Sequence, residues 1–81
     1  MPITHQEFQQ AQRGDVFRDG AGRPWDFVQK VPQAIYLAVL HPQGGKLEQI
    51  GFCPLVQRFF RLDGTLVNEL NSPTARFEPK S

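Results

Sequence analysis

Cys53, His5 and His41 are the residues whose chemistry could support nucleophilic catalysis, because a thiol beside an imidazole can act as nucleophile and base. Their positions favour a simpler role. Cys53 lies between Phe52 and Pro54, where a free thiol usually packs as a small hydrophobic group. Neither histidine has a second ligand at the spacing that metal sites use. We therefore predict no catalytic residue, no metal site and no cofactor.

Three aspartates, Asp15, Asp19 and Asp26, could supply general acid–base chemistry, since all three surround one predicted hairpin. Asp15 and Asp19 stand at expected turns, whereas Asp26 alternates with apolar residues and is expected on a solvated strand face. Residues 20–22 (Gly-Ala-Gly) resemble a phosphate-binding loop, but no predicted helix follows them to bind an anion. We therefore assign these carboxylates to structure and not to catalysis.

Arginine and aromatic residues supply the binding chemistry of this sequence. Six of the nine cationic residues are Arg, and Arg makes planar, stacked and bidentate contacts. Arg beside aromatic rings is typical of grooves that bind single-stranded nucleic acid. The residues that would line such a groove are Arg18, Arg23, Arg58 and Arg61. The net charge of +1 provides little attraction to phosphate, so a nucleic-acid-binding regulator is the alternative interpretation.

Protein–protein binding is the favoured interpretation, because Trp, Tyr and Arg dominate the energetic centres of interfaces. The candidate contact residues are Arg23, Trp25, Tyr36 and Arg58. Trp25 and Tyr36 would serve equally well as core residues, and the sequence leaves that alternative open. The predicted partner is another protein or a second copy of this chain, as in a homodimer. The predicted function is therefore that of a small non-enzymatic adaptor or modulator.

The elements that position these residues are short. Residues 4–7 (Thr-His-Gln-Glu) form a capping-box pattern, which predicts a helix over about residues 4–13. Strands are predicted at 15–18, 25–29, 34–40 and 47–52, the third covered on both faces and the fourth bulged at Gly51. Residues 53–60 could hold one helical turn that points Leu55 and Val56 inward. Asp63 and Gly64 predict a hairpin with a two-residue primed turn.

Short strands separated by turn residues at intervals of about ten residues predict a mainly β fold, a small antiparallel barrel of five to six strands. A short helix precedes this barrel. The 81 residues suit one domain, which we place at residues 1–70. Residues 71–81 are polar and interrupted by proline, so we expect a flexible C-terminal tail in which Phe77 packs against the body.

Residues 14–19 (Gly-Asp-Val-Phe-Arg-Asp), residues 22–25 (Gly-Arg-Pro-Trp), a long apolar strand and residues 54–62 (Pro-Leu-Val-Gln-Arg-Phe-Phe-Arg-Leu) follow in this order. The order resembles the small SH3-like-barrel proteins of unknown function found among bacteria, phages and mobile elements. The resemblance spans residues 14–62. It implies an SH3-like barrel of bacterial or mobile-element origin and implies no activity, since this fold hosts peptide, protein and nucleic-acid binding alike.

Composition excludes several other classes of protein. One cysteine cannot form an intramolecular disulfide, so the chain is not a disulfide-stabilised secreted scaffold. The longest apolar run, residues 34–40, is far shorter than the roughly 18 residues that a membrane span needs. The N-terminal residues lack a basic segment followed by an apolar one, so we expect no signal peptide. We therefore predict a cytoplasmic protein with no membrane partner.

Overall fold

An antiparallel sheet of six strands makes up most of the structure, a computed structural model that describes residues 2–34 and 36–80. Its hydrogen-bonded order is β5-β4-β3-β2-β1-β6, so five consecutive strands form a meander and the last strand is added beside the first. Within the described residues one short helix, α1 (His5–Gln10), precedes the sheet. The strands are β1 (Val16–Arg18), β2 (Pro24–Lys30), β3 (Leu37–Pro42), β4 (Glu48–Cys53), β5 (Arg58–Arg61) and β6 (Arg76–Glu78).

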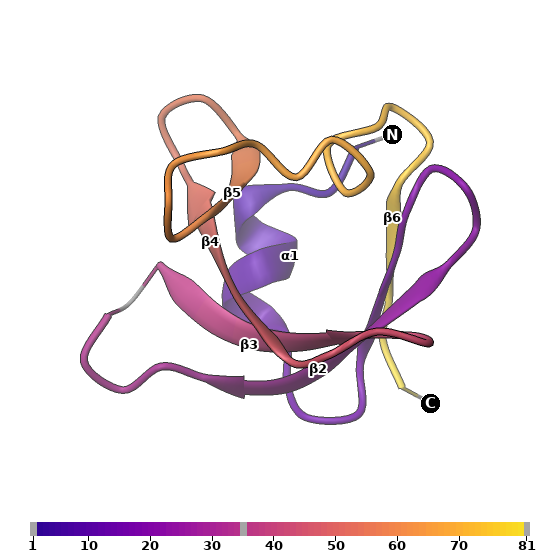
Figure 1. Ribbon diagram of the computed structural model, residues 1–81, viewed down its shortest axis with the longest axis horizontal. Helices are drawn as coiled ribbons and strands as arrows, with labels where there is room; N and C mark the ends of the chain where they lie inside the picture. Colours follow the sequence, from indigo (N-terminus) through magenta and orange to yellow (C-terminus); the bar gives the residue numbers. More distant parts are fainter. Residues whose placement is uncertain (1, 35, 81) are drawn as a thin grey trace.

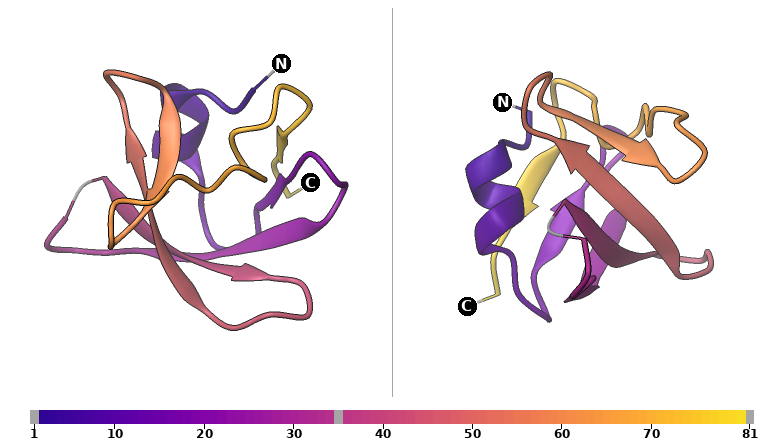
Figure 2. Two further views of the ribbon diagram at one scale, coloured as in Figure 1. Left: turned by 45° about the horizontal axis from the view of Figure 1, so that its top comes forward. Right: turned by 90° about the vertical axis from the view of Figure 1, so that its left-hand side faces the viewer.

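The sheet is strongly curled and forms a half-barrel around the helix (Figure 1). The left-hand view of Figure 2 shows α1 across the open side of this half-barrel, with β4 and β5 on one side of the helix and β6 on the other. The edges of the sheet are β5 and β6, and the helix covers the gap between them. The predicted fold class, mainly β and antiparallel with a short N-terminal helix, is confirmed.

Helix α1 begins at the predicted capping box. Oγ1 of Thr4 accepts a hydrogen bond from the N–H of Glu7 at 3.2 Å, and the Glu7 carboxylate accepts one from the N–H of Thr4 at 3.0 Å. The helix ends at Gln10, earlier than predicted, and the Asp15 carboxylate binds the N–H of Gln12 beyond it at 2.8 Å. Among the described residues, no helix has the length and apolar character needed to cross a membrane.

Phenylalanine rings from the helix and the sheet fill the half-barrel. The ring centroid of Phe8 lies 5.5 Å from that of Phe52 and 5.9 Å from that of Phe59. Phe17 meets Phe59 at 5.6 Å. Such aromatic pairs add a favourable contact to the burial of apolar area, so Phe8 fixes the helix to the sheet. The buried apolar residues are Ile3, Phe8, Ala11, Phe17, Trp25, Phe27, Ala38, Leu40, Ile50, Phe52, Phe59, Val67, Leu70 and Ala75.

Asp19 organises the turn between β1 and β2. Its Oδ1 accepts hydrogen bonds from the N–H groups of Ala21 and Arg23, both at 2.9 Å, and its Oδ2 accepts one from Nε1 of Trp25 at 3.0 Å. These bonds replace the water that the buried carboxylate loses. Trp25 is only 1% exposed and belongs to the core, which decides the alternative that the sequence left open. Asp26 faces solvent on β2, as predicted.

Strand β3 differs from the prediction of a strand covered on both faces. Ala38 and Leu40 are buried, whereas their neighbour His41 is half-exposed. The helix and the aromatic core cover only the concave face of the half-barrel, so residues that point to the convex face contact solvent. The strand begins at Leu37, and Ile35 of the predicted strand lies outside the described residues.

Gly51 lies in regular strand pairing, so the bulge predicted there is wrong. It stands opposite Leu37 of β3 and Phe60 of β5. A Cβ atom at this position would overlap the ring of Phe60, so the glycine permits a close approach of that ring. The register shift of the sheet falls instead between Phe27 and Gln29 of β2.

The hairpin after β5 turns over three residues, 62–64, where a two-residue primed turn was predicted. The N–H of Arg61 donates to the carbonyl of Thr65 at 2.8 Å. A primed two-residue turn of the expected type needs positive φ at both central residues, and of the pair Asp63 and Gly64 only the glycine adopts it. The Asp63 carboxylate instead accepts hydrogen bonds from Thr65, which hold the pKa of Asp63 below its ordinary value.

The segment predicted as a flexible tail contributes strand β6. This strand pairs with β1, and the ring centroids of the opposed residues Phe17 and Phe77 are 5.4 Å apart. Ala75 is buried, and the N–H of Lys80 donates to the Asp15 carboxylate at 2.9 Å. Within the segment expected to be a flexible tail, residues 75–80 are therefore paired and packed, because the strand obtains its partners from the distant β1 segment. The predicted packing of Phe77 is confirmed.

We expect Asp19→Ala to lower the free energy of unfolding by about 2–4 kcal/mol, because three hydrogen-bond donors in the hairpin lose their acceptor. Urea denaturation followed by the fluorescence of Trp25 measures this change. The matched control is Asp26→Ala, which removes an exposed carboxylate from the same hairpin and should change stability by less than about 0.5 kcal/mol. Equal effects of the two substitutions would contradict the role assigned to Asp19.

Candidate interaction surface

An apolar cavity of about 360 Å³ opens where β3 begins and β4 ends. Its most exposed rim residues are Tyr36 and Leu55, with 43% and 91% of their areas exposed. A concave apolar site with an aromatic rim is the usual form of a binding site. The lining residues, which we name the Tyr36 surface, are Tyr36, Phe52, Cys53, Pro54, Leu55 and Phe60.

The turn between β4 and β5, residues 54–57, holds Leu55 in solvent. The N–H of Gln57 donates to the carbonyl of Cys53 at 2.8 Å, so a single turn is present. The inward packing predicted for Leu55 and Val56 is wrong, since both side chains are exposed. The physical reason is that this turn joins two neighbouring strands at the rim of the half-barrel, where it has no core to face.

Gln57 connects this turn to helix α1 through hydrogen bonds of its side chain. Its Oε1 accepts a hydrogen bond from the N–H of His5 at 3.0 Å, and its Nε2 donates to the carbonyl of Pro54 at 2.7 Å. Gln57 has a φ of 56°, a conformation that costs free energy for a residue with a Cβ atom. The two side-chain hydrogen bonds offset that cost and set the position of Leu55 relative to the helix.

The two histidines lie in different parts of the structure. The His5 ring stacks on Phe52 at a centroid distance of 5.9 Å, and its Nε2 is buried without a hydrogen-bond partner among the described residues. His41 lies at the far end of β3, where its Nε2 contacts the carbonyl of Gly45 at 3.0 Å. Within residues 2–34 and 36–80, no group of three or more His, Cys, Asp or Glu side chains could hold a metal ion.

The four predicted contact residues do not form one site. Tyr36 lines the apolar cavity, and Arg58 stands opposite Cys53 in the β4–β5 pairing at the same end of the sheet. Arg23 precedes β2 at the other end, and Trp25 is buried beneath it. The structure therefore brings Tyr36 and Arg58 to one end of the molecule and removes Trp25 from the set of surface residues.

Arg23 links two hairpins and has a structural role. Its Nε donates to the carbonyl of Gln43 at 2.8 Å, so it joins the start of β2 to the turn after β3. Its guanidinium carbon lies 5.7 Å from the ring centroid of Trp25, a distance at which a cation is attracted to an aromatic face. Arg23 thus covers Trp25 from solvent.

Two arginines of the nucleic-acid alternative are paired with carboxylates. Arg18 makes two hydrogen bonds to Glu78, each of 3.0 Å, and Nε of Arg61 lies 3.1 Å from Oε1 of Glu48. The hydrogen bonds between Arg18 and Glu78 raise the pKa of the guanidinium and lower the pKa of the carboxyl group. Neutralised arginines attract phosphate less strongly, so this pairing weakens the nucleic-acid interpretation.

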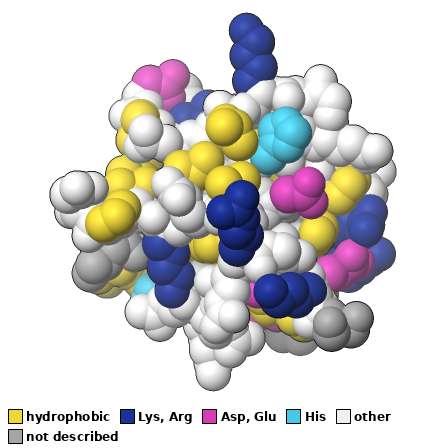
Figure 3. All heavy atoms as spheres, turned by 90° about the horizontal axis from the view of Figure 1, so that it is seen from below, with side chains coloured by type: hydrophobic (Ala, Val, Ile, Leu, Met, Phe, Trp, Pro, Cys, Tyr) yellow, Lys and Arg dark blue, Asp and Glu magenta, His cyan; other side chains and the backbone are white. Residues whose placement is uncertain are grey.

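Charged side chains are mixed over the face shown in Figure 3. Lys and Arg side chains stand apart from one another on this face, with Asp and Glu among them, and hydrophobic side chains gather toward the upper left. The described residues form no continuous basic patch on the face in view. A groove for single-stranded nucleic acid needs a basic track along the backbone, and this face does not provide one.

Comparison of the chain with family models, with curated proteins and with solved structures gives no match in any of the three. The function must therefore be argued from the residues themselves. The Tyr36 surface combines concavity, apolar character and exposure.

Sequence reasoning missed Leu55, the most exposed residue of the Tyr36 surface. A usable signal was present in the spacing of the predicted strands. Between the strand predicted at 47–52 and the hairpin turn predicted at Asp63 and Gly64 there is room for one further strand and a short connection that begins with Cys53 and Pro54. Such short connections run over the surface, so their apolar residues are exposed and available for binding.

We expect acid to weaken the attachment of β6. The pKa of Glu78 lies below its ordinary value of 4.5 because Arg18 donates hydrogen bonds to the carboxylate. The stabilisation from Glu78 is therefore complete above that value and is lost as the pH falls through the lower pKa of the folded state. Glu78→Gln should be less stable than the parent at neutral pH, and the difference should shrink below about pH 4.5.

Urea denaturation at a series of pH values between about 7 and 3 measures this convergence. Glu69→Gln is the control, because the exposed Glu69 side chain makes no ion pair among the described residues. A stability difference for Glu78→Gln that stays constant over the whole pH range would disprove the role given to the carboxylate.

Proposed function

We propose that this protein is a small non-enzymatic binding module, an adaptor or modulator that docks an apolar side chain of a protein partner on the Tyr36 surface. The observation that carries the proposal is the 91% exposure of Leu55 beside an apolar cavity of about 360 Å³. Leaving a leucine in water costs on the order of 2 kcal/mol relative to burying it. A partner that covers Leu55 recovers this free energy.

Tyr36 within this surface and Arg58 beside it, opposite Cys53, provide the polar groups that specificity needs. Both residue types are enriched at the energetic centres of interfaces. Nη1 of Arg58 donates to the carbonyls of Val56 and Gln57 at 3.3 and 3.0 Å, and Arg58 has no carboxylate partner among the described residues. Arg58 can therefore bind an acidic group on the partner while the apolar cavity receives its side chain.

We also propose that the fold is SH3-like and that the protein is of bacterial or mobile-element origin. The curled antiparallel sheet of six strands supports the first, and the resemblance over residues 14–62 is the support for the second. The half-buried thiol of Cys53 is free, which favours a reducing compartment such as the cytoplasm.

Leu55→Glu should weaken the complex with the native partner by at least about tenfold, because a carboxylate replaces the apolar side chain that the partner covers. The partner is captured with the tagged chain from its native host, identified, purified and titrated by isothermal calorimetry. Leu62→Glu is the matched control, since Leu62 is exposed but lies outside the cavity, and it should leave the affinity within about twofold.

Light scattering on the same variants tests whether the partner is a second copy of this chain. In that case the parent is a dimer and Leu55→Glu is a monomer. A Leu55→Glu variant that stays folded and binds its partner as tightly as the Leu62→Glu control would refute the proposal.

The alternative is a nucleic-acid-binding regulator that uses Arg18, Arg23, Arg58 and Arg61. Only Arg23 and Arg58 of this set lack a carboxylate partner among the described residues, and they lie at opposite ends of the sheet. Two separated cations supply few phosphate contacts, and phosphate contacts provide most of the affinity for nucleic acid.

We therefore expect no measurable binding of short single- or double-stranded oligonucleotides at about 50 mM salt. Fluorescence anisotropy with labelled oligonucleotides, repeated over a range of salt concentrations, provides the measurement. Tight binding with a steep dependence on salt, lost on Arg58→Ala, would make the nucleic-acid alternative correct and the protein-binding proposal wrong.

A further inference from the structure

The two edges of the sheet differ in whether their outward backbone N–H and C=O groups have hydrogen-bond partners. At the β5 edge, the N–H of Val67 donates to the carbonyl of Phe59 at 3.1 Å. The side-chain amide of Asn71 accepts from the N–H of Phe59 at 2.6 Å and donates to its carbonyl at 3.0 Å. Asn71 thus occupies the position of a neighbouring strand, and this edge is sealed against further pairing.

The directions in which the N–H and C=O groups of β6 point can be derived from the directions of the same groups in β1. In an antiparallel pair, successive residues turn their N–H and C=O groups to opposite sides of the strand. The carbonyl of Asp15 accepts from the N–H of Phe27, and the N–H of Asp19 donates to the carbonyl of Arg23. The odd-numbered residues of β1 therefore face β2, and the even-numbered ones face β6.

Phe77 consequently presents its backbone to the free edge of the sheet. The register pairs Val16 with Glu78 and Arg18 with Arg76, so the even-numbered residues of β6 make the hydrogen bonds to β1. By this register the N–H and C=O of Phe77 point away from β1, and no loop backbone group or side chain of the described residues bonds to them. The β6 edge thus offers one donor and one acceptor in the geometry that an added strand requires.

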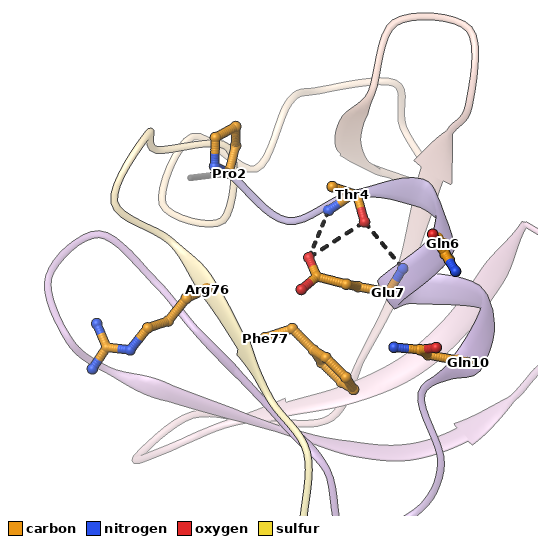
Figure 4. A pocket seen from close by; sticks show the side chains of 7 residues that line it. All are labelled: Pro2, Thr4, Gln6, Glu7, Gln10, Arg76 and Phe77. Carbon is orange, nitrogen blue, oxygen red and sulfur yellow. Dashed lines mark hydrogen bonds between the residues drawn. The ribbon is translucent and has the colours of Figure 1, made fainter.

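A cleft of about 500 Å³ lies beside this edge, between β6 and α1. In Figure 4 the Phe77 ring reaches from β6 toward the helix, Glu7 and Gln10 extend toward the cleft from the helix, and Arg76 points away from the helix. The side chains of Gln6 and Gln10 carry amides, which both donate and accept hydrogen bonds and so suit a peptide backbone. The cleft is lined by Pro2, Thr4, Gln6, Glu7, Gln10, Arg76 and Phe77.

The β6 side of the cleft carries an excess positive charge. Arg18 and Arg76 share the single carboxylate of Glu78, with N–O distances of 3.0 and 2.9 Å, so two cations face one anion. The Arg76 side chain is 61% exposed and can bind a second carboxylate. The Glu7 carboxylate keeps its charge but lies on the opposite wall, on the helix, where it accepts hydrogen bonds from Thr4 in the capping box. The charge at the β6 rim therefore complements an acidic side chain.

We propose that the cleft between α1 and β6 binds an extended, acidic peptide segment of a partner protein as a seventh strand. The backbone of the segment bonds to the N–H and C=O of Phe77, and a carboxylate of the segment bonds to Arg76. Pro79 has no N–H and ends the free edge, so β6 accepts a short segment and does not support open-ended sheet stacking. This site is separate from the Tyr36 surface.

The test begins with a phage-displayed library of random heptapeptides selected on the full chain. We expect the selected sequences to carry Asp or Glu at one constant position among residues that favour strands. A representative peptide is then synthesised with a fluorescent label, and its affinity for the parent is measured by anisotropy. Replacing its acidic residue by the corresponding amide should weaken binding to the parent by about tenfold and should have little effect on binding to Arg76→Ala.

N-methylation of the peptide, one amide at a time, tests the backbone pairing without altering the protein. Because alternate amides of a strand face the β6 edge, methylation should weaken binding by about tenfold at alternate central positions and by less than about twofold between them. Leu55→Glu should bind the peptide as the parent does, so a failure of the proposed function leaves this result unaffected.

Three results would overturn the inference. The first is a selection that enriches no acidic sequences over the starting library. The second is a selected peptide whose affinity does not alternate with the site of methylation. The third is a peptide that loses its affinity on Leu55→Glu and keeps it on Arg76→Ala, which would place its binding at the Tyr36 surface.

Discussion

The packing of Phe8 against the rings of Phe17, Phe52 and Phe59 is the interaction on which the rest of this structure depends. A sheet that curls without pairing its edges exposes its concave apolar face to water. Helix α1 has only six residues, too few to be stable alone, yet it brings Phe8 to the centre of that face. Sheet and helix therefore stabilise each other, and neither forms a complete core without the other.

This mutual dependence also explains where the two proposed binding surfaces lie. The helix meets the sheet along two seams, one at the β4–β5 turn and one beside β6. At the first seam Gln57 anchors the turn to the N-terminus of α1, and the anchored turn exposes Leu55. At the second seam the helix leaves a cleft, and the N–H and C=O of Phe77 face the edge of the sheet that has no neighbouring strand among the described residues. Both surfaces arise because a short helix takes the place of further strands.

Several arginines of this small protein make contacts within the molecule. Of the arginines that suggested nucleic-acid binding, Arg18 and Arg61 are paired with glutamates, and Arg23 covers the buried Trp25. Of the arginines named in the two proposals, Arg58 has no carboxylate partner among the described residues, and Arg76 is largely exposed beside the carboxylate that it shares with Arg18.

The sequence predicted the features that depend on residues close together in the chain. These features include the capping box of Thr4, the turn at Asp19 and the alternation along β2. Their hydrogen bonds and side-chain directions are set locally, by backbone geometry and residue type. The burial of Trp25 and the pairing of β6 with β1 were decided by the assembled fold. Their partners stand far along the chain, as Glu78 does from Arg18, and local patterns carry no information about which distant segments will meet.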